Sequence, residues 1–312
     1  MYHHSKTIMK NKLYTLLLST LFCSGAWADN EPWQNPQMNA LNREPMHAHF
    51  TPYTNEANAL KQRALPADVR FNVNPNTERR ISLDGIWKFL YSKNNKECPT
   101  DFYKPNYNTR KWKDIEVPGS WELQGFDAPI YTDTRYPFPP NPPFVPSDYN
   151  PVGIYIREFT VPANWEDLDI FLDFEGVESA YYVWVNGQQA GYAEDSRLPS
   201  HFNITPLLKK GKNKLAVKVF RYSDGSYLEG QDYWKYSGIE RSVYLYARPQ
   251  SRVKDFQLNA TLTNQYKDGN LELLVTLQQP KKGETIEVKV LDQDKKTIFE
   301  KNSRQPRPLT PY

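Results

Sequence analysis

A dense group of acidic and aromatic side chains lies between Arg221 and Arg241. Its carboxylates and rings are Asp224, Tyr227, Glu229, Asp232, Tyr233, Trp234 and Tyr236. Neutral sugars are bound by such a mixture, because an aromatic ring covers the C–H face of a pyranose while carboxylates accept its hydroxyl protons. The same composition also suits a tightly packed loop with satisfied carboxylates, so the segment alone leaves both interpretations open.

Short β-strands are the elements that must position this segment. Side chains alternate with period two at 170–175 and at 215–220, which predicts half-buried strands. A hairpin is predicted at 181–192, because its Asn186-Gly187 pair suits a type I′ turn. The 25 prolines disfavour a helical protein, since proline is excluded from helix interiors. We therefore expect an all-β chain.

Two later regions differ from these strands. Between Asp133 and Pro151, seven of 19 residues are proline, which predicts an ordered loop without repeating structure. After Pro249, about four alternating strands fit before Tyr312, whereas an immunoglobulin-like sandwich needs roughly seven. We expect this second sandwich to be incomplete.

The first 28 residues have the features of a signal peptide. Lys10 and Lys12 precede a ten-residue, mostly apolar run, and Ala26-Trp27-Ala28 offers a small-x-small cleavage site. The run is too short to span a bilayer, so no membrane span is expected. We therefore expect residues 1–28 to be removed and the protein to be exported, as a periplasmic or secreted protein.

Removal of that segment leaves a chain without net charge. The whole sequence has 39 Lys and Arg against 36 Asp and Glu, and residues 1–28 hold three lysines and no acid. Without a basic excess to neutralise phosphates, a nucleic-acid partner is not expected. Cys98 would be left without a second cysteine for an intrachain disulfide, and no Cys/His spacing indicates zinc.

Five strings in the sequence occur in an order that resembles a known family. They are Trp33-Gln-Asn-Pro, Gly125-Phe-Asp-Ala-Pro-Ile-Tyr-Thr132, Asn141-Pro-Pro-Phe-Val-Pro146, Gly191-Tyr-Ala-Glu-Asp-Ser-Arg-Leu-Pro-Ser200 and the segment from Ser223 to Arg241. Together they cover most of residues 33–250 and look like the N-terminal region of β-galactosidases of glycoside hydrolase family 2. The Asn-Pro-Pro-Phe-Val-Pro and Ser-Asp-Gly-Ser-Tyr-Leu-Glu strings favour β-galactosidase over β-glucuronidase or β-mannosidase relatives.

The resemblance implies a jelly-roll sugar-binding domain at 81–249, preceded by an extended arm at 29–80 and followed by a partial immunoglobulin-like domain at 250–312. It also implies a C-terminal catalytic (β/α)8 barrel of the same polypeptide, which would carry the two carboxylic acids of a retaining glycosidase. Glu194 and Asp195 cannot replace that pair, because neighbouring residues of a strand point to opposite faces. We therefore expect no catalytic residue in this chain and no hydrolysis by it alone.

The resemblance further implies two residues that contact substrate. Asp232 matches an aspartate that holds a sodium ion near the bound galactose, and a hard cation prefers such oxygen ligands. Asp133 stands where the relatives have a sugar-contacting Asn, and a carboxylate accepts hydroxyl protons but cannot donate as an amide does. Trp234 is expected in the core rather than as a platform for a sugar ring.

A second cation site is implied by the same resemblance. Asn35 and Asp224 match positions that help to hold a structural divalent ion, and Glu194 replaces a Gln at a third position. An acidic ligand expected near Trp33 is replaced by Pro32, with Glu31 beside it. Three oxygen donors would suit Mg²⁺ or Ca²⁺, and solvated surface acids are the alternative.

Three hypotheses about function follow. The first is that the chain is the sugar-binding and scaffold portion of an exported β-galactosidase, which hydrolyses terminal non-reducing β-D-galactose residues from β-galactosides. The second is a freestanding carbohydrate-binding module without catalysis, and the third is an interaction domain that buries its 29–80 arm on a partner. A half-finished second sandwich favours the first, because it would expose strand edges and core if it stood alone.

Overall fold

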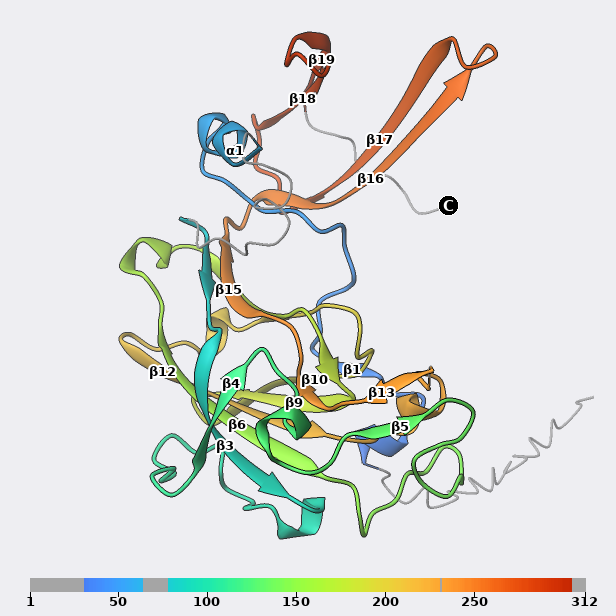
Figure 1. Cartoon of the computed structure of the whole chain (residues 1–312). Coiled ribbons are helices and arrows are strands. Elements are labelled where there is room, and N and C mark those ends of the chain that lie inside the picture. The colour runs from blue at the N-terminus through green and yellow to red at the C-terminus, as the bar shows by residue number, and fades with distance from the viewer. Residues whose placement is uncertain (1–30, 64–77, 231, 305–312) are drawn as a thin grey trace, which may run out of the picture.

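The computed structural model of the chain describes residues 31–63, 78–230 and 232–304. These ranges consist mainly of β-strands (Figure 1), which confirms the predicted all-β class. Within them lie the α-helix α1 (Glu56–Arg63) and the short 3₁₀ helices η1 (Pro32–Gln34), η2 (Asn95–Glu97), η3 (Glu122–Gln124), η4 (Ala163–Trp165), η5 (Thr205–Leu207) and η6 (Asp224–Tyr227). No helix of the described ranges is long and apolar enough to cross a membrane. The predicted signal peptide at 1–28 lies outside the described residues.

Two antiparallel sheets pack face to face. The larger has the order β1-β10-β9-β12-β6-β3-β4. Its strands are β1 (Ala40–Leu41), β3 (Gly85–Ser92), β4 (Lys113–Val117), β6 (Val152–Thr160), β9 (Ala180–Val185), β10 (Gln188–Ala193) and β12 (Lys212–Phe220). The smaller has the order β11-β7-β15-β2 and consists of β2 (Arg80–Ser82), β7 (Asp169–Phe174), β11 (Ser200–Asn203) and β15 (Val243–Arg248). One apolar core fills the space between them, with Trp87 and Val217 from one sheet and Leu172 and Leu245 from the other.

The central strand β12 is buried on both faces, whereas its sequence pattern predicted a half-buried strand. Val217 and Val219 face the core between the sheets. Phe220 belongs to a second apolar cluster on the opposite face, where its ring stacks on Trp33 at a centroid distance of 4.9 Å. The prediction of a half-buried strand was wrong because segments distant in sequence pack on the outer face of β12. Period-two alternation along one strand does not show whether other segments pack on its polar face.

The predicted hairpin is confirmed. Strands β9 and β10 are joined by Asn186 and Gly187, whose φ angles of 53° and 87° both lie in the left-handed region that a type I′ turn requires. On β10, Gly191 permits a close backbone approach, because a Cβ there would lie 2.5 Å from the carbonyl oxygen of Leu41. This contact lets the arm strand β1 pair with the edge of the sheet.

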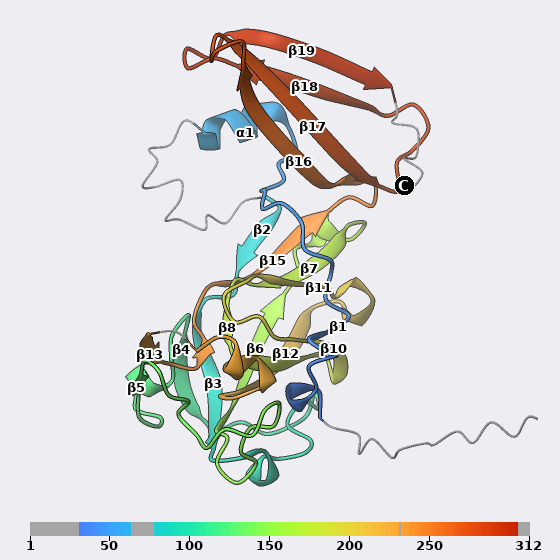
Figure 2. The ribbon, with the colours of Figure 1, turned by 90° about the vertical axis from the view of Figure 1, so that its right-hand side faces the viewer.

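The N-terminal arm packs on the sandwich of its own chain. Ala40 pairs with Ala193, and the amide of Glu44 donates to the carbonyl oxygen of His201 at 2.8 Å. The arm runs along the sandwich toward α1 (Figure 2). It is not extended throughout, since residues 56–63 are helical. The surface that the third hypothesis assigned to a partner is therefore engaged within the chain.

The last described region consists of two hairpins. Strand β16 (Arg252–Thr263) pairs with β17 (Asp268–Gln278), and β18 (Thr285–Leu291) pairs with β19 (Thr297–Arg304). These are the four strands predicted after Pro249. Within the described ranges no ladder joins the two hairpins. Leu258, Leu262 and Phe299 are exposed. The jelly-roll and immunoglobulin-like types, and the boundaries at 29–80, 81–249 and 250–312, stay predictions.

Candidate functional site

A two-stranded ribbon carries the two predicted sugar-contacting residues. In it β5 (Ile130–Thr132) pairs with β13 (Tyr233–Lys235), with Tyr233 opposite Thr132. Asp133 directly follows β5 and Asp232 directly precedes β13, so the two residues flank the same end of the ribbon. The Tyr131 hydroxyl donates to Oδ1 of Asp232 at 2.5 Å, and Oδ1 of Asp133 accepts from the amide of Thr134. The fold thus brings two carboxylates from distant segments to one end of the ribbon.

Trp234 lies on the exposed side of this ribbon. Its side chain is 48% exposed, its ring stacks on Tyr236 at 6.4 Å and it meets Tyr131 at 5.6 Å. The expectation of a core tryptophan was therefore wrong. The ribbon projects from the sandwich, so alternate residues of β13 face solvent.

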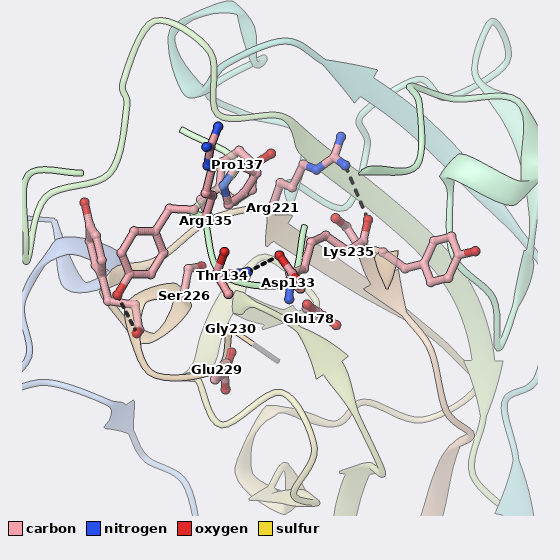
Figure 3. A pocket seen from close by; sticks show the side chains of 15 residues that line it. Asp133, Thr134, Arg135, Pro137, Glu178, Arg221, Ser226, Glu229, Gly230 and Lys235 are labelled. Carbon is pink, nitrogen blue, oxygen red and sulfur yellow. Dashed lines mark hydrogen bonds between the residues drawn. The ribbon is translucent and has the colours of Figure 1, made fainter. Parts of the chain in front are cut away.

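Asp133 also lines a cavity of about 170 Å³, whereas Asp232 lies outside it. Figure 3 shows its lining residues, which come from the proline-rich loop, from β8 (Val177–Glu178) and from the segment that follows β12. Three of the lining residues, Glu178, Arg221 and Ser237, were not predicted as site residues from the sequence. Arg221 and Ser237 fall inside the segment singled out by composition, but Glu178 carried no signal of its own.

Arg197 fixes the ribbon to the sandwich. Its Nη2 lies 2.5 Å from Oε2 of Glu178 and donates to the Tyr233 hydroxyl at 2.7 Å, while Nη1 bonds Glu240. Burial, followed by the charge of Glu240, raises the pKa of Glu178 to about 8. The Arg197 guanidinium thereby connects Glu178 and Glu240 to Tyr233, which is the residue that follows Asp232.

A buried arginine, Arg221, holds the base of the cavity. The Arg221 side chain is 1% exposed; its Nη1 lies 2.5 Å from Oδ2 of Asp127, and its Nη2 lies 3.6 Å from Oε1 of Glu122. Nη2 also donates to the carbonyl oxygen of Ala128 at 3.1 Å. Burial raises the pKa of Glu122 to about 7, although Arg221 opposes this shift.

The residues of the predicted divalent site also come together. Glu194 and Asp224 are close enough to shift each other's pKa, and helix η1, which ends beside Asn35, contacts η6, which begins at Asp224. The Tyr192 hydroxyl donates to Glu194, and burial, with the neighbouring Asp224, raises the Glu194 pKa to about 8. Burial raises the pKa of Asp224 as well.

These donors fit a hard divalent cation. Oδ1 of Asp224 is buried without a hydrogen-bond partner among the described residues, which is costly unless a cation or proton compensates it. Oδ1 of Asn35 accepts a local bond from the amide of Gln37, at 3.1 Å. The described ranges contain no cluster of three Asp, Glu, His or Cys ligands, so the amide oxygen would be the third donor.

Comparison with known proteins gives a family match over the sandwich. Residues 81–249, just over half of the chain, match the family described as "Glycosyl hydrolases family 2, sugar binding domain". A beta-galactosidase of Priestia megaterium (strain DSM 319 / IMG 1521) is 43% identical over 243 residues, which are 77% of this chain and 22% of that protein. A beta-galactosidase of Halalkalibacterium halodurans is 40% identical over 251 residues, which are 79% of this chain and 24% of that protein. The chain thus spans about a quarter of the length of these relatives or less.

Solved structures with a similar fold include beta-glucuronidases. That of an uncultured Clostridium sp. has a TM-score of 0.54 and 20% identity, covering 74% of this chain and 39% of that one. That of Bacteroides uniformis has a TM-score of 0.56 and 20% identity, covering 72% and 25%. At this identity the similarity shows the fold alone.

Proposed function

Because this chain belongs to glycoside hydrolase family 2, whose sugar-binding domain it carries, we propose that it is the N-terminal sugar-binding and scaffold portion of a β-galactosidase. The substrates would be β-galactosides with a terminal non-reducing β-D-galactose. The observation that carries the proposal is the position of Asp133 and Asp232, which flank the same end of the β5–β13 ribbon. Sequence identity near 40% to proteins named beta-galactosidase supports galactose as the sugar.

In this proposal the chain binds and orients substrate but does not cleave it. Carboxylates at the ribbon end accept hydroxyl protons of the sugar, and Asp232 also supplies oxygen to a sodium ion. The general acid and the nucleophile of a retaining glycosidase would come from a C-terminal barrel of the same polypeptide. The protein would be exported, in keeping with the features of residues 1–28.

We expect the purified chain to leave a chromogenic β-galactoside intact, because Glu194, Asp224 and Glu178 are committed to buried clusters of the sandwich rather than to two sides of one glycosidic bond. Release of the chromophore is measured over hours, with a complete family 2 β-galactosidase as the positive control. Turnover that copurifies with the chain would overturn this division of roles.

Asp232→Asn should weaken sodium binding roughly tenfold, since an amide oxygen lacks the charge that a carboxylate offers the cation. The measurement is sodium-23 relaxation of the purified chain during a sodium chloride titration. Asp268→Asn, at an exposed acid on the distant hairpin β16–β17, is the matched control. Equal titrations for both variants would remove Asp232 from the proposed sodium site.

Ca²⁺ or Mg²⁺ should stabilise the chain more at about pH 8.5 than at about pH 5.5. The pKa of Glu194 is raised from 4.5 to about 8 on folding, so its buried charge lowers stability as the pH rises through that window, and a cation offsets this loss. At a hundredfold excess over Kd the gain is about 2.7 kcal/mol. Thermal unfolding of the chain and of Asp224→Ala, with and without cation, measures it. A gain that survives in Asp224→Ala would place the ion elsewhere.

A further inference from the structure

Between β1 and α1 the N-terminal arm passes the junction of β15 and β16 (Figure 2). Residues 44–50, which we call the strap, bond to elements on both sides of this junction. The amide of Glu44 donates to the carbonyl oxygen of His201 on β11 at 2.8 Å. The amide of Ala48 donates to Oδ1 of Asp255 on β16, also at 2.8 Å. The strap therefore connects the sandwich to the hairpin β16–β17.

Two histidine rings lie at the centre of this contact. His47 of the strap stacks on His201 at a centroid distance of 4.7 Å and an interplanar angle of 24°. At the edge of the His201 ring, Nδ1 lies 3.0 Å from Oδ2 of the fully buried Asp173 on β7. Nδ1 of His47 bonds the carbonyl oxygen of Ala48 at 2.8 Å. Because a carbonyl oxygen only accepts, this Nδ1 carries its hydrogen, and a further proton must bind Nε2.

The surroundings of His47 disfavour a positive charge on its ring. Burial lowers the pKa of His47 below its ordinary value of 6.5, and the neighbouring His201 and Arg248 add to this shift. The bond to the Ala48 carbonyl oxygen and the charge of Asp255 oppose the shift without reversing it. His47 is only partly buried, so protons from solvent reach its ring.

The other charged and titratable groups of this contact come from three strands of the sandwich, from β16 and from the strap. They are Asp173 of β7, Arg80 of β2, Tyr244 and Tyr246 of β15, Arg252 of β16, and Glu44 and His49 of the strap. Arg80 is paired with Glu175 at 3.3 Å, and Asp173 is paired with His201. These pairs are formed within the sandwich and do not require the strap.

Arg248 is the cation that packs on the strap itself. Its guanidinium carbon lies 4.5 Å from the centroid of the Phe50 ring. The Phe50 ring also meets Phe256 of β16 at 5.8 Å. A protonated His47 would thus be held close to Arg248 by the same segment that joins the sandwich to the hairpin, and like charges in a partly buried contact repel.

We propose that residues 44–50 form a pH-sensitive strap, which docks on the sandwich and on hairpin β16–β17 while His47 is neutral and detaches when His47 is protonated. Detachment removes the bonds of Glu44 to β11 and of Ala48 to β16. This inference goes beyond the proposed function, because it gives the arm control over how the hairpin is held on the sandwich.

The direction of the pH dependence follows from the docked environment. On detachment the His47 ring becomes hydrated, and its pKa returns to the ordinary value of 6.5, above that of the docked state. The detached strap therefore binds the proton more tightly than the docked strap does. Docking is complete above about pH 6.5 and weakens as the pH falls below that value.

The test is backbone hydrogen exchange of the purified chain at about pH 7.5 and at about pH 5, corrected for the intrinsic pH dependence of exchange. The amides of Glu44 and Ala48 report the two contacts of the strap. Their protection factors should fall at least about tenfold at the lower pH. The amides of β9, which is paired on both sides, report global unfolding and should stay protected.

Two variants of His47 cannot be protonated at this position. His47→Phe keeps an aromatic ring on His201, and His47→Asn keeps a donor for the carbonyl oxygen of Ala48. In both variants we expect the Glu44 and Ala48 amides to be equally protected at the two pH values. His49→Phe, at an exposed histidine of the same strap, is the matched control and should keep the pH dependence of the parent chain.

Four results would overturn the inference. They are equal protection of the strap amides in the parent chain at both pH values, the parent's loss of protection reproduced in His47→Phe and His47→Asn, removal of the pH dependence by His49→Phe, and a matching loss across β9. The last would mean that the whole sandwich unfolds. None of these results concerns the ribbon or its sodium titration, so the proposed function is tested separately.

Discussion

Arg221→Leu should lower the free energy of unfolding by about 3–5 kcal/mol, because it leaves buried carboxylates without their counter-charge. The Glu122 side chain is 0% exposed and that of Asp127 is 10% exposed, and both face the guanidinium. Leucine fills much of the volume but provides none of the hydrogen bonds that Arg221 donates. Urea unfolding, read as a shift of the midpoint at constant slope, measures the loss.

The pH dependence of this loss has a definite sign. The folded pKa of Glu122 is about 7, above its ordinary value of 4.5, so its ionisation already lowers stability as the pH rises through that range. Without Arg221, which holds this pKa down, the charged form becomes still less favourable. The destabilisation should therefore be larger at about pH 8 than at about pH 5.

The matched control is an ion pair on the surface. Lys212→Ala removes a pair with Glu158 whose side chains are 79% and 64% exposed, and exposed pairs of this kind contribute about 0–1 kcal/mol. Glu122→Gln added to Arg221→Leu should recover part of the stability, because it removes one of the two orphaned charges. Equal effects of Arg221→Leu and Lys212→Ala would contradict the role given to the buried pair.

Trp33→Ala should cost about 3–5 kcal/mol and should free the arm from the sandwich. The Trp33 ring is 4% exposed and stacks on Phe220 at an interplanar angle of 18°, so its removal leaves a cavity over the outer face of β12. Thermal unfolding measures the stability. In the parent chain the backbone of Arg43 forms an isolated antiparallel β-bridge with Phe202. Tryptic cleavage after Arg43 therefore reports release of the arm.

Tyr266→Ala, at a residue that is 82% exposed, controls for the loss of an aromatic ring and should change stability by less than about 0.5 kcal/mol. Unaltered stability and proteolysis in Trp33→Ala would mean that the arm contributes nothing to its own sandwich. The hypothesis of an arm reserved for a partner would then regain its basis.

Local sequence signals were sufficient for the strands and for one turn. The Asn186-Gly187 pair predicted a hairpin, since few other residues adopt positive φ at two consecutive positions without strain. The alternation along β12 predicted a strand, but it could not show that Trp33 and Phe138 would cover its outer face. Trp234 was predicted in the core but is exposed. The local sequence around an aromatic residue is the same on a projecting ribbon as in a core, so it could not show this difference.

The sequence by itself determined the all-β class and the set of candidate residues, because backbone preferences and side-chain alternation act between near neighbours along the chain. Only the tertiary structure decided which of these residues meet. Asp133 and Asp232 flank the same end of one ribbon, and Glu194 lies beside Asp224, although the partners in each pair come from distant segments. Such meetings depend on strand order and on loop packing across the whole sandwich, which no local pattern encodes.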